Sequence, residues 1–183
     1  MSFVKTIRKK TQLRQLYKEH AGDYRPMQLA FLLQDWDDPY NVGGMFRIAD
    51  ACGAHEIVMC GKTPTPPHPQ IHVTSMGQHR RVTWRHLGAK SDEAAKALKA
   101  EGYSLVAVEI AEGATHYMEF EYPEKLCLVL GSEGAGVFGN VMKQCDGAVF
   151  IPMAGKGRSL NVHVAAAVVA FEVLLGTQGQ ATP

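Results

Sequence analysis

The 183-residue chain lacks a long uninterrupted apolar run, and this absence argues against a membrane span. The longest candidate, Val162–Leu175, is interrupted by His163 and Glu172 and falls short of the roughly 20 residues that cross a bilayer. The first ten residues also lack the apolar core of a secretory signal. We therefore expect a cytoplasmic protein with no membrane partner.

The chain also lacks the cysteine spacing of a disulfide framework or a zinc site. Its cysteines stand far apart: Cys52, Cys60, Cys127 and Cys145. No pair forms Cys-x-x-Cys, so we expect reduced thiols. His68 and His72 are four residues apart, but the neighbouring Pro67 and Pro69 argue against a helix that would turn both imidazoles toward one metal ion. No metal is expected.

Apolar residues make up 46% of the chain and charged residues 20%, which is typical of a globular domain and argues against a disordered chain. The formal net charge of +1 conceals a basic N-terminal arm, residues 1–25, where seven cations face only Glu19 and Asp23. The cations are Lys5, Arg8, Lys9, Lys10, Arg14, Lys18 and Arg25. The arm therefore contrasts with a mildly acidic remainder.

The arm also has the apolar spacing of an amphipathic helix, with Phe3, Ile7, Leu13, Leu16 and Tyr17. A basic segment attracts phosphate-rich partners, because neutralising phosphates releases their counterions. The same pattern is also compatible with a solvated surface helix that binds no ligand.

Strand-like apolar runs alternate with helical patterns over the rest of the chain. Strands are predicted at Gln28–Gln34, Glu56–Cys60, Arg81–His86, Tyr103–Ile110, Lys125–Leu130 and Ala148–Ile151. Helices are predicted at Val42–Gly53, Ser91–Glu101 and Leu160–Leu175. Because the strands are apolar on both faces, we expect an α/β fold with a mostly parallel sheet flanked by helices.

Three parts of the chain are distinguished. Residues 1–25 are the basic arm, residues 26–176 form one α/β domain, and residues 177–183 form a frayed tail. Four prolines predict a loop over residues 61–70. In an open α/β sheet, ligands bind beyond the carboxyl ends of the strands, so the loops that follow strands are the candidate sites.

The first such loop runs from Asn41 to Arg47 and contains Gly43. Asn41 is predicted to cap the following helix. The guanidinium of Arg47 has the fork geometry that grips a phosphate or a carboxylate. The alternative is an ordinary surface arginine on an amphipathic helix.

The second loop, residues 131–136, holds three glycines in six positions, which lets a ligand approach the backbone closely. Its spacing differs from the G-x-G-x-x-G of dinucleotide sites, which argues against that class. Glu133 in such a loop requires a cation or a hydrogen-bond donor. The alternative is a plain glycine turn.

The third loop runs from Ile151 to Asn161 and contains Gly-Lys, but Gly157 follows the lysine where a phosphate-binding P-loop has Ser or Thr. Ser159 is predicted to cap the next helix. His163 on the first turn of that helix is interpreted either as a hydrogen-bonded packing residue or as a base.

Together the three loops resemble the motifs of the SpoU/TrmH-like family of SPOUT RNA methyltransferases. The first matches N-x-G-x-x-x-R through Asn41, Gly43 and Arg47. Residues 128–136 resemble its L-x-x-G-x-E-x-x-G segment, and residues 151–162 match I-P-M-x-G-x-x-x-S-L-N-V throughout. The resemblance covers residues 27–175. His163 is a departure, since many members have a small Ser there.

The resemblance implies a C-terminal trefoil knot and a homodimer with its active site near the subunit boundary. It also implies transfer of a methyl group from S-adenosylmethionine to a ribose 2′-oxygen in tRNA or rRNA. The knot comes only from the resemblance, because knots are nearly absent among folds. Since the chain has no large separate RNA-binding domain, tRNA is favoured over rRNA.

The resemblance also assigns residues to roles. Arg47 would activate the 2′-hydroxyl, Asn41 would support its loop, and Glu133 would orient Arg47 or the RNA, while Ser159 and Asn161 would complete the site. The cofactor would be held by Val108, Glu109, Leu130, Gly131, Ile151, Met153 and Leu160. The RNA would be held by Arg8, Lys9, Lys10, Arg14, Arg25 and Arg158.

Two other functions remain open at this point. One is a module of the same fold that binds RNA or the cofactor without catalysis. The other is a nucleotide-dependent oxidoreductase, which the glycine spacing and the lack of a ribose-binding acid disfavour.

Overall fold

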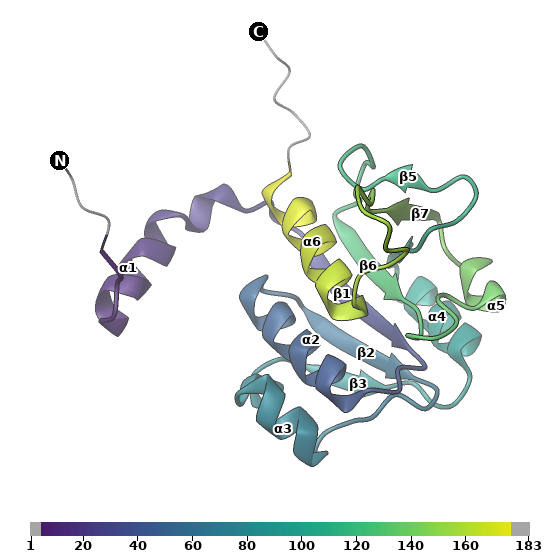
Figure 1. The fold of residues 1–183 in the computed structure, drawn as a ribbon, viewed down its shortest axis with the longest axis horizontal. Coiled ribbons are helices and arrows are strands. Elements are labelled where there is room, and N and C mark those ends of the chain that lie inside the picture. The colour runs from purple at the N-terminus through teal and green to yellow at the C-terminus, as the bar shows by residue number, and fades with distance from the viewer. Residues whose placement is uncertain (1–4, 177–183) are drawn as a thin grey trace, which may run out of the picture.

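The computed structural model describes residues 5–176, in which a seven-stranded sheet lies between two helical layers (Figure 1). The strands are β1 (Gln28–Gln34), β2 (Glu56–Cys60), β3 (Trp84–His86), β4 (Ser104–Val108), β5 (Thr115–His116), β6 (Lys125–Leu130) and β7 (Gly147–Phe150). Their order in the sheet is β3-β2-β1-β6-β4-β7-β5, and every neighbouring pair is parallel. The expected parallel α/β fold is therefore confirmed.

Helices occupy both faces of the sheet. Among residues 5–176 the helices are α1 (Lys10–Glu19), which lies away from the sheet, α2 (Pro39–Ala51), α3 (Pro69–Ser75), α4 (Ser91–Ala100), α5 (Gly139–Met142) and α6 (Val162–Leu175), together with 3₁₀ turns at Ala21–Asp23 and Gln78–Arg80. Residues of α2, α3 and α6 join one buried cluster, and residues of α4 and α5 join the other. Each face of the sheet thus has its own core.

The two cores explain why the strands are apolar at successive positions. In β1, Phe31 and Leu33 belong to the core under α2 and α6, whereas Leu32 belongs to the core under α4. Side chains alternate between the faces of a strand, so a strand covered on both sides must be apolar throughout. The central strands β1 and β6 were predicted with their observed bounds for this reason.

The helix starts differ from the predictions. Asp38 caps α2 by accepting a hydrogen bond from the Tyr40 amide (2.8 Å), and Pro39 occupies the first turn. Asn41 therefore lies inside the first turn, and its predicted capping role is wrong. Proline suits this position because its fixed φ matches the helix and the missing N–H would have no partner there.

The predicted cap of α6 is wrong as well. Asn161, not Ser159, caps α6 by accepting from the His163 amide (3.1 Å). Helix α4 begins at Ser91, whose hydroxyl donates to the Asp35 carboxylate. In α2 and in α6, two residues able to cap lie close together, and tertiary contacts decide between them.

Short elements were missed. Pro69 begins α3, so the loop predicted over residues 61–70 ends earlier than expected. The two-residue strand β5 and the four-residue helix α5 were not predicted. The predicted strands at Arg81–His86, Tyr103–Ile110 and Ala148–Ile151 are observed as the shorter β3, β4 and as β7.

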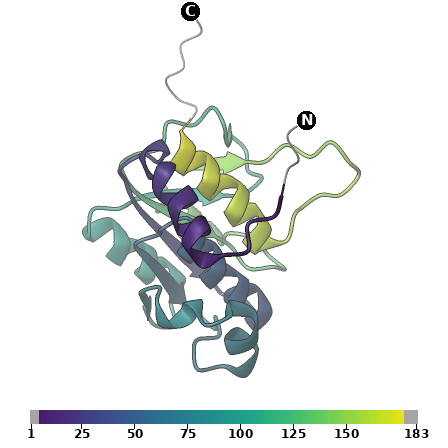
Figure 2. The ribbon, with the colours of Figure 1, turned by 90° about the vertical axis from the view of Figure 1, so that its left-hand side faces the viewer.

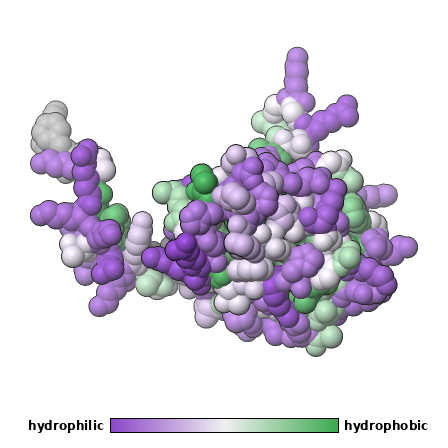
Figure 3. All heavy atoms as spheres, turned by 90° about the horizontal axis from the view of Figure 1, so that it is seen from below, coloured by the Kyte–Doolittle hydropathy of each residue, from purple (hydrophilic) through white to green (hydrophobic). Residues whose placement is uncertain are grey.

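The basic arm contains a helix, α1, that projects from the body (Figures 1 and 3). None of its residues is buried. The expected apolar face is present, and Ile7 and Tyr17 are exposed, so the arm adds little to the core. Phe3 and the predicted tail 177–183 lie outside the described residues.

Within residues 5–176, no helix is long and apolar enough to cross a bilayer. The long connection between β7 and α6 extends beside α6 in Figure 2. The knot in this part of the chain stays a prediction.

All four cysteines are free thiols. Burial raises the pKa of Cys60 and of Cys52 to about 11, so both thiols stay protonated at neutral pH. Cys127 is fully buried in β6, and burial raises its pKa as well. Such protonated thiols are poor nucleophiles and act as small apolar side chains.

Replacing Trp36 by Phe should destabilise the fold. The Trp36 side chain is fully buried, and its Nε1 donates to the Leu130 carbonyl (3.2 Å) at the end of β6. The loss of volume and of this hydrogen bond should lower the free energy of unfolding by about 2–4 kcal/mol, measured by urea denaturation. Trp84→Phe, at the sheet edge, is the matched control and should cost about 1 kcal/mol or less. Equal losses in both variants would contradict this account.

Candidate functional site

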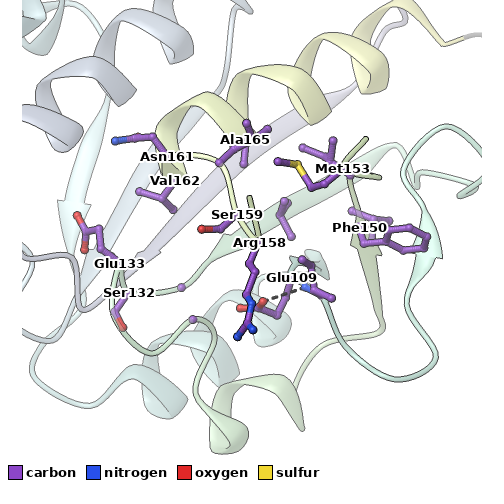
Figure 4. Close-up of a pocket in the computed structure, with 17 residues that line it drawn as sticks. Glu109, Ser132, Glu133, Phe150, Met153, Arg158, Ser159, Asn161, Val162 and Ala165 are labelled. Carbon is purple, nitrogen blue, oxygen red and sulfur yellow. Dashed lines mark hydrogen bonds between the residues drawn. The ribbon is translucent and has the colours of Figure 1, made fainter. Parts of the chain in front are cut away.

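A cavity of about 450 Å³ lies at the carboxyl ends of β4, β6 and β7 (Figure 4). Its walls come from these strand ends, from the glycine loop (residues 131–138), and from residues 151–165, which run into α6. The volume falls in the usual range for small-molecule sites, and the position is the one at which open α/β sheets bind ligands.

The glycine loop is folded tightly on itself. Ser132 and Gly136 exchange two backbone hydrogen bonds (3.1 and 2.9 Å), and Gly136 has a φ of +65°. A Cβ atom added to Gly131 would lie 2.1 Å from the carbonyl carbon of Gly136, so no side chain fits at that position. Glycine is therefore required at this position by backbone-to-backbone contact.

Two side chains fasten this loop to the sheet. Gln34, fully buried at the end of β1, donates to the Gly136 carbonyl (3.3 Å) and accepts from the Phe138 amide (2.7 Å). Glu109 accepts from the Val137 amide (2.9 Å). Gln34 was not predicted as a site residue. Its one signal in the sequence is that it is polar at the end of an otherwise apolar strand.

The Asn41 side chain joins the three loops. Its Nδ2 donates to Glu133 Oε1 (2.9 Å), and its Oδ1 accepts from Asn161 Nδ2 (3.0 Å). The same Oδ1 lies 3.0 Å from His163 Nδ1. Asn41 itself is buried. Residues separated by about 120 positions therefore meet at one amide group.

Glu133 has the donors that its place in a glycine loop requires. Besides the Asn41 amide, its carboxylate accepts from the backbone amides of Asp37 (3.0 Å) and Asp38 (3.4 Å). These amides lie at the start of α2, where negative charge is favourable. Glu133 thus fixes the helix that carries Arg47, without contacting Arg47 directly.

Arg47 lies beside the cavity. Its side chain is exposed and lines a shallow hollow that adjoins the cavity across Asn41. We call this the α2–α3 hollow; it is lined by Tyr40, Asn41, Gly44, Arg47, Val73, Thr74, Met76 and His163. The structure therefore places Arg47 in the same hollow as Asn41, whose hydrogen bonds reach two residues of the cavity wall, but not in the cavity itself.

The other predicted site residues divide as follows. Six of the predicted cofactor residues line the cavity: Val108, Glu109, Gly131, Ile151, Met153 and Leu160. So do Glu133, Arg158, Ser159 and Asn161. Leu130 is buried beneath the cavity, and its carbonyl accepts a hydrogen bond from the Trp36 side chain. Arg25 is half-buried, and its guanidinium donates to the Tyr122 carbonyl (3.3 Å), away from the free part of the arm.

Burial lowers the pKa of His163 below its ordinary value of 6.5, and the nearby Asp38 carboxylate opposes this shift. The imidazole is therefore neutral at pH 7. Among residues 5–176, no three His, Cys, Asp or Glu side chains are grouped so that they could hold a metal ion.

The chain matches the model of the SpoU rRNA Methylase family over residues 28–171. A tRNA (guanosine(18)-2′-O)-methyltransferase of Thermus thermophilus is 34% identical over 171 residues, which are 91% of this chain and 84% of the relative. A 23S rRNA (guanosine(2553)-2′-O)-methyltransferase of Bacillus subtilis is 33% identical over 78% of this chain and 56% of its own.

A solved structure supports the same fold. AviRb, the SpoU methyltransferase of Streptomyces viridochromogenes, in complex with the cofactor AdoMet, matches with a TM-score of 0.74 and 27% identity. The match covers 81% of this chain and 60% of AviRb. The chain thus spans only part of the length of some of its relatives.

Gly131→Ala should distort the glycine loop, because the new Cβ would meet backbone that cannot move aside. We expect the free energy of unfolding to fall by about 1–3 kcal/mol and S-adenosylmethionine affinity, measured by calorimetry, to fall about tenfold or more. Gly134→Ala is the matched control, since nothing lies within 4 Å of an added Cβ there. It should change stability by less than about 0.5 kcal/mol. Unchanged affinity in Gly131→Ala would contradict this model of the loop.

Proposed function

Because the chain belongs to the SpoU rRNA Methylase family, we propose that it transfers a methyl group from S-adenosylmethionine to a ribose 2′-oxygen in RNA. The observation that carries the proposal is the junction at Asn41. It links the loops of Arg47, Glu133 and Asn161 at the edge of the cavity. A methyl acceptor in the α2–α3 hollow would lie next to a donor in the cavity.

The cavity residues fit S-adenosylmethionine. Apolar side chains such as Ile151 and Leu160 suit the adenosine part, and the close-packed backbone of the glycine loop offers peptide groups for hydrogen bonding. Charges of both signs, from Glu109, Glu133 and Arg158, suit the sulfonium and the zwitterionic amino-acid part. When bound, the cofactor supplies a methyl group already activated by its positive sulfur.

The protein side chains must then position the acceptor and its charge. A guanidinium is a poor base but a strong electrostatic partner for a developing alkoxide, and we assign this second role to Arg47. Glu133 and Asn161 hold the first turn of α2 through Asn41, which aligns the helix that carries Arg47. Alignment of the 2′-oxygen with the methyl group supplies the rest of the rate increase.

We propose tRNA as the substrate in preference to rRNA. The Thermus relative, which this chain covers over most of its length, is named for tRNA. A short basic arm projects from the described part of the chain, and we propose that it helps to hold the RNA. Reduced cysteines and a tRNA substrate both accord with activity in the cytoplasm.

We also propose a homodimer. Helix α6 is apolar around most of its circumference, and its residues Val164, Phe171 and Leu175 remain exposed. Exposed apolar residues clustered on one helix are typical of a subunit interface. A second copy of the chain would cover them.

The alternative is a module of the same fold that binds RNA or the cofactor without transferring a methyl group. The presence of Asn41, Arg47, Glu133, Ser159 and Asn161 weighs against it.

Arg47→Ala should abolish methyl transfer and leave cofactor binding intact, because Arg47 lies outside the cavity. Transfer of tritium-labelled methyl groups to tRNA from cells lacking this protein should fall by about 10²-fold or more. Lys96→Ala, on the opposite face of the sheet, is the control and should keep the wild-type rate. A normal rate in Arg47→Ala would remove Arg47 from the mechanism, and a wild-type protein that binds the cofactor but methylates no RNA would favour the inactive module.

Changing Arg8, Lys9, Lys10 and Arg14 together to Gln should weaken RNA binding and leave cofactor affinity unchanged. These residues belong to the projecting arm, which contacts little of the body. If all four contact phosphates, the slope of log K against log salt should fall by roughly 3. Filter binding at several salt concentrations measures this slope. Lys90→Gln with Lys96→Gln is the control, and an unchanged slope in the arm variant would exclude the arm from RNA binding.

A further inference from the structure

Besides Arg47, the α2–α3 hollow contains the ionisable side chain of His163, to which the family resemblance gives no role. It lies on the first turn of α6 and lines the hollow together with Arg47. Its neighbour Asn161 lines the cavity. The histidine therefore stands where the proposed acceptor and donor sites meet.

The hydrogen bonds around Asn41 determine which imidazole nitrogen carries the proton. The Asn41 Nδ2 donates to the Glu133 carboxylate, so its Oδ1 must face the opposite way. That oxygen accepts from Asn161 Nδ2 and lies 3.0 Å from His163 Nδ1. Since an amide oxygen can only accept, Nδ1 must be the protonated nitrogen. The neutral ring then carries a lone pair on Nε2.

Nε2 is placed at the wall of the hollow. The ring lies against the backbone of α2 at Gly44, where an added Cβ would come within 3.0 Å of Cδ2 and 3.1 Å of Nε2. Within residues 5–176 no side chain or backbone group forms a hydrogen bond with Nε2, which leaves it available to a ligand. Gly44 is thus the residue that allows the imidazole to pack here.

The charges that face the imidazole are few. The Asp38 carboxylate comes from the residue that caps α2, and the Arg47 guanidinium and the Tyr40 hydroxyl come from α2 itself. In and directly after α3, the residues that line the hollow are the uncharged Val73, Thr74 and Met76. Glu133 is separated from the ring by the Asn41 amide. Burial keeps the ring neutral at pH 7, so it can accept a proton.

The rim of the hollow suits a nucleoside. Tyr40, Val73 and Met76 are large apolar side chains with 52%, 69% and 71% of their surface exposed. An exposed tyrosine can stack on any base, because every base has a π-face. The hollow thus combines an apolar rim with a cation and an uncharged base.

We propose that His163 is the catalytic base of this protein, a statement that rests on the methyltransferase function proposed above. The ribose 2′-oxygen forms a bond to the methyl carbon, and the methyl–sulfur bond breaks with its electron pair passing to sulfur. The hydroxyl proton passes to His163 Nε2, which gives an imidazolium and a neutral thioether. Arg47 stabilises the negative charge that develops on the 2′-oxygen. The hydrogen bond to Asn41 keeps the proton of the neutral imidazole on Nδ1, so that Nε2 is free to accept.

His163→Asn tests this role, because an asparagine amide can occupy the place of Nδ1 and donate to Asn41 but offers nothing at the place of Nε2. In single-turnover assays with tritium-labelled S-adenosylmethionine and tRNA from cells lacking this protein, the rate should fall about 10²-fold. The affinities for both ligands should stay within about threefold. His55→Asn, at the amino end of β2, is the matched control and should keep the wild-type rate.

The pH profile gives a second readout that a purely structural role would not move. The wild-type rate should fall as the pH drops through the pKa of His163, below 6.5, because the imidazolium cannot accept a proton. This limb should be absent in His163→Asn. A variant with the wild-type rate and profile, next to an inactive Arg47→Ala, would overturn this inference alone. No transfer by the wild-type protein to tRNA or rRNA would overturn the proposed function with it.

Discussion

The site depends on one buried amide, that of Asn41. Its two ends make different hydrogen bonds, one donated to Glu133 and the others accepted from Asn161 and His163. A buried amide with a carboxylate at its nitrogen end and donors at its oxygen end has only one favourable orientation, because turning it over would place donors against donors. This orientation fixes the start of α2, the first turn of α6 and the tautomer of the histidine. Three segments far apart in the sequence are thereby held in one arrangement.

The central part of the fold could be predicted from the sequence because its signal is redundant. Strands β1, β2 and β6 are continuous apolar runs that each begin at a polar residue, and each was predicted with its observed bounds. A strand that is buried on both faces must be apolar at nearly every position, so its sequence shows one clear pattern. The position of β6 between β1 and β4 could not be predicted, since periodicity says nothing about which strands pair.

Helix starts and parts of the site were harder to predict, for a different reason. Asp38 and Asn41 are both able to cap α2, as Ser159 and Asn161 are for α6, and only contacts with distant residues decide between them. The convergence of the three loops followed from the rule for strand ends, and the structure bears it out. Gln34 was missed because its partners, Gly136 and Phe138, lie about a hundred residues away in the sequence. Burial of a polar side chain is visible only once its partners are known.

The fastening of the glycine loop by Gln34 makes the two walls of the cavity unequal. One wall is tied to the sheet through a buried amide, and opening it would require breaking hydrogen bonds in the core. The facing wall, residues 152–160, is exposed along its whole length and so has fewer buried contacts to lose. A small molecule would therefore enter and leave past the exposed wall, while the glycine loop stays in place. Substitutions in residues 152–160 would change the rate at which the molecule dissociates. The glycine loop, which Gln34 holds in place, would determine which molecules fit the cavity.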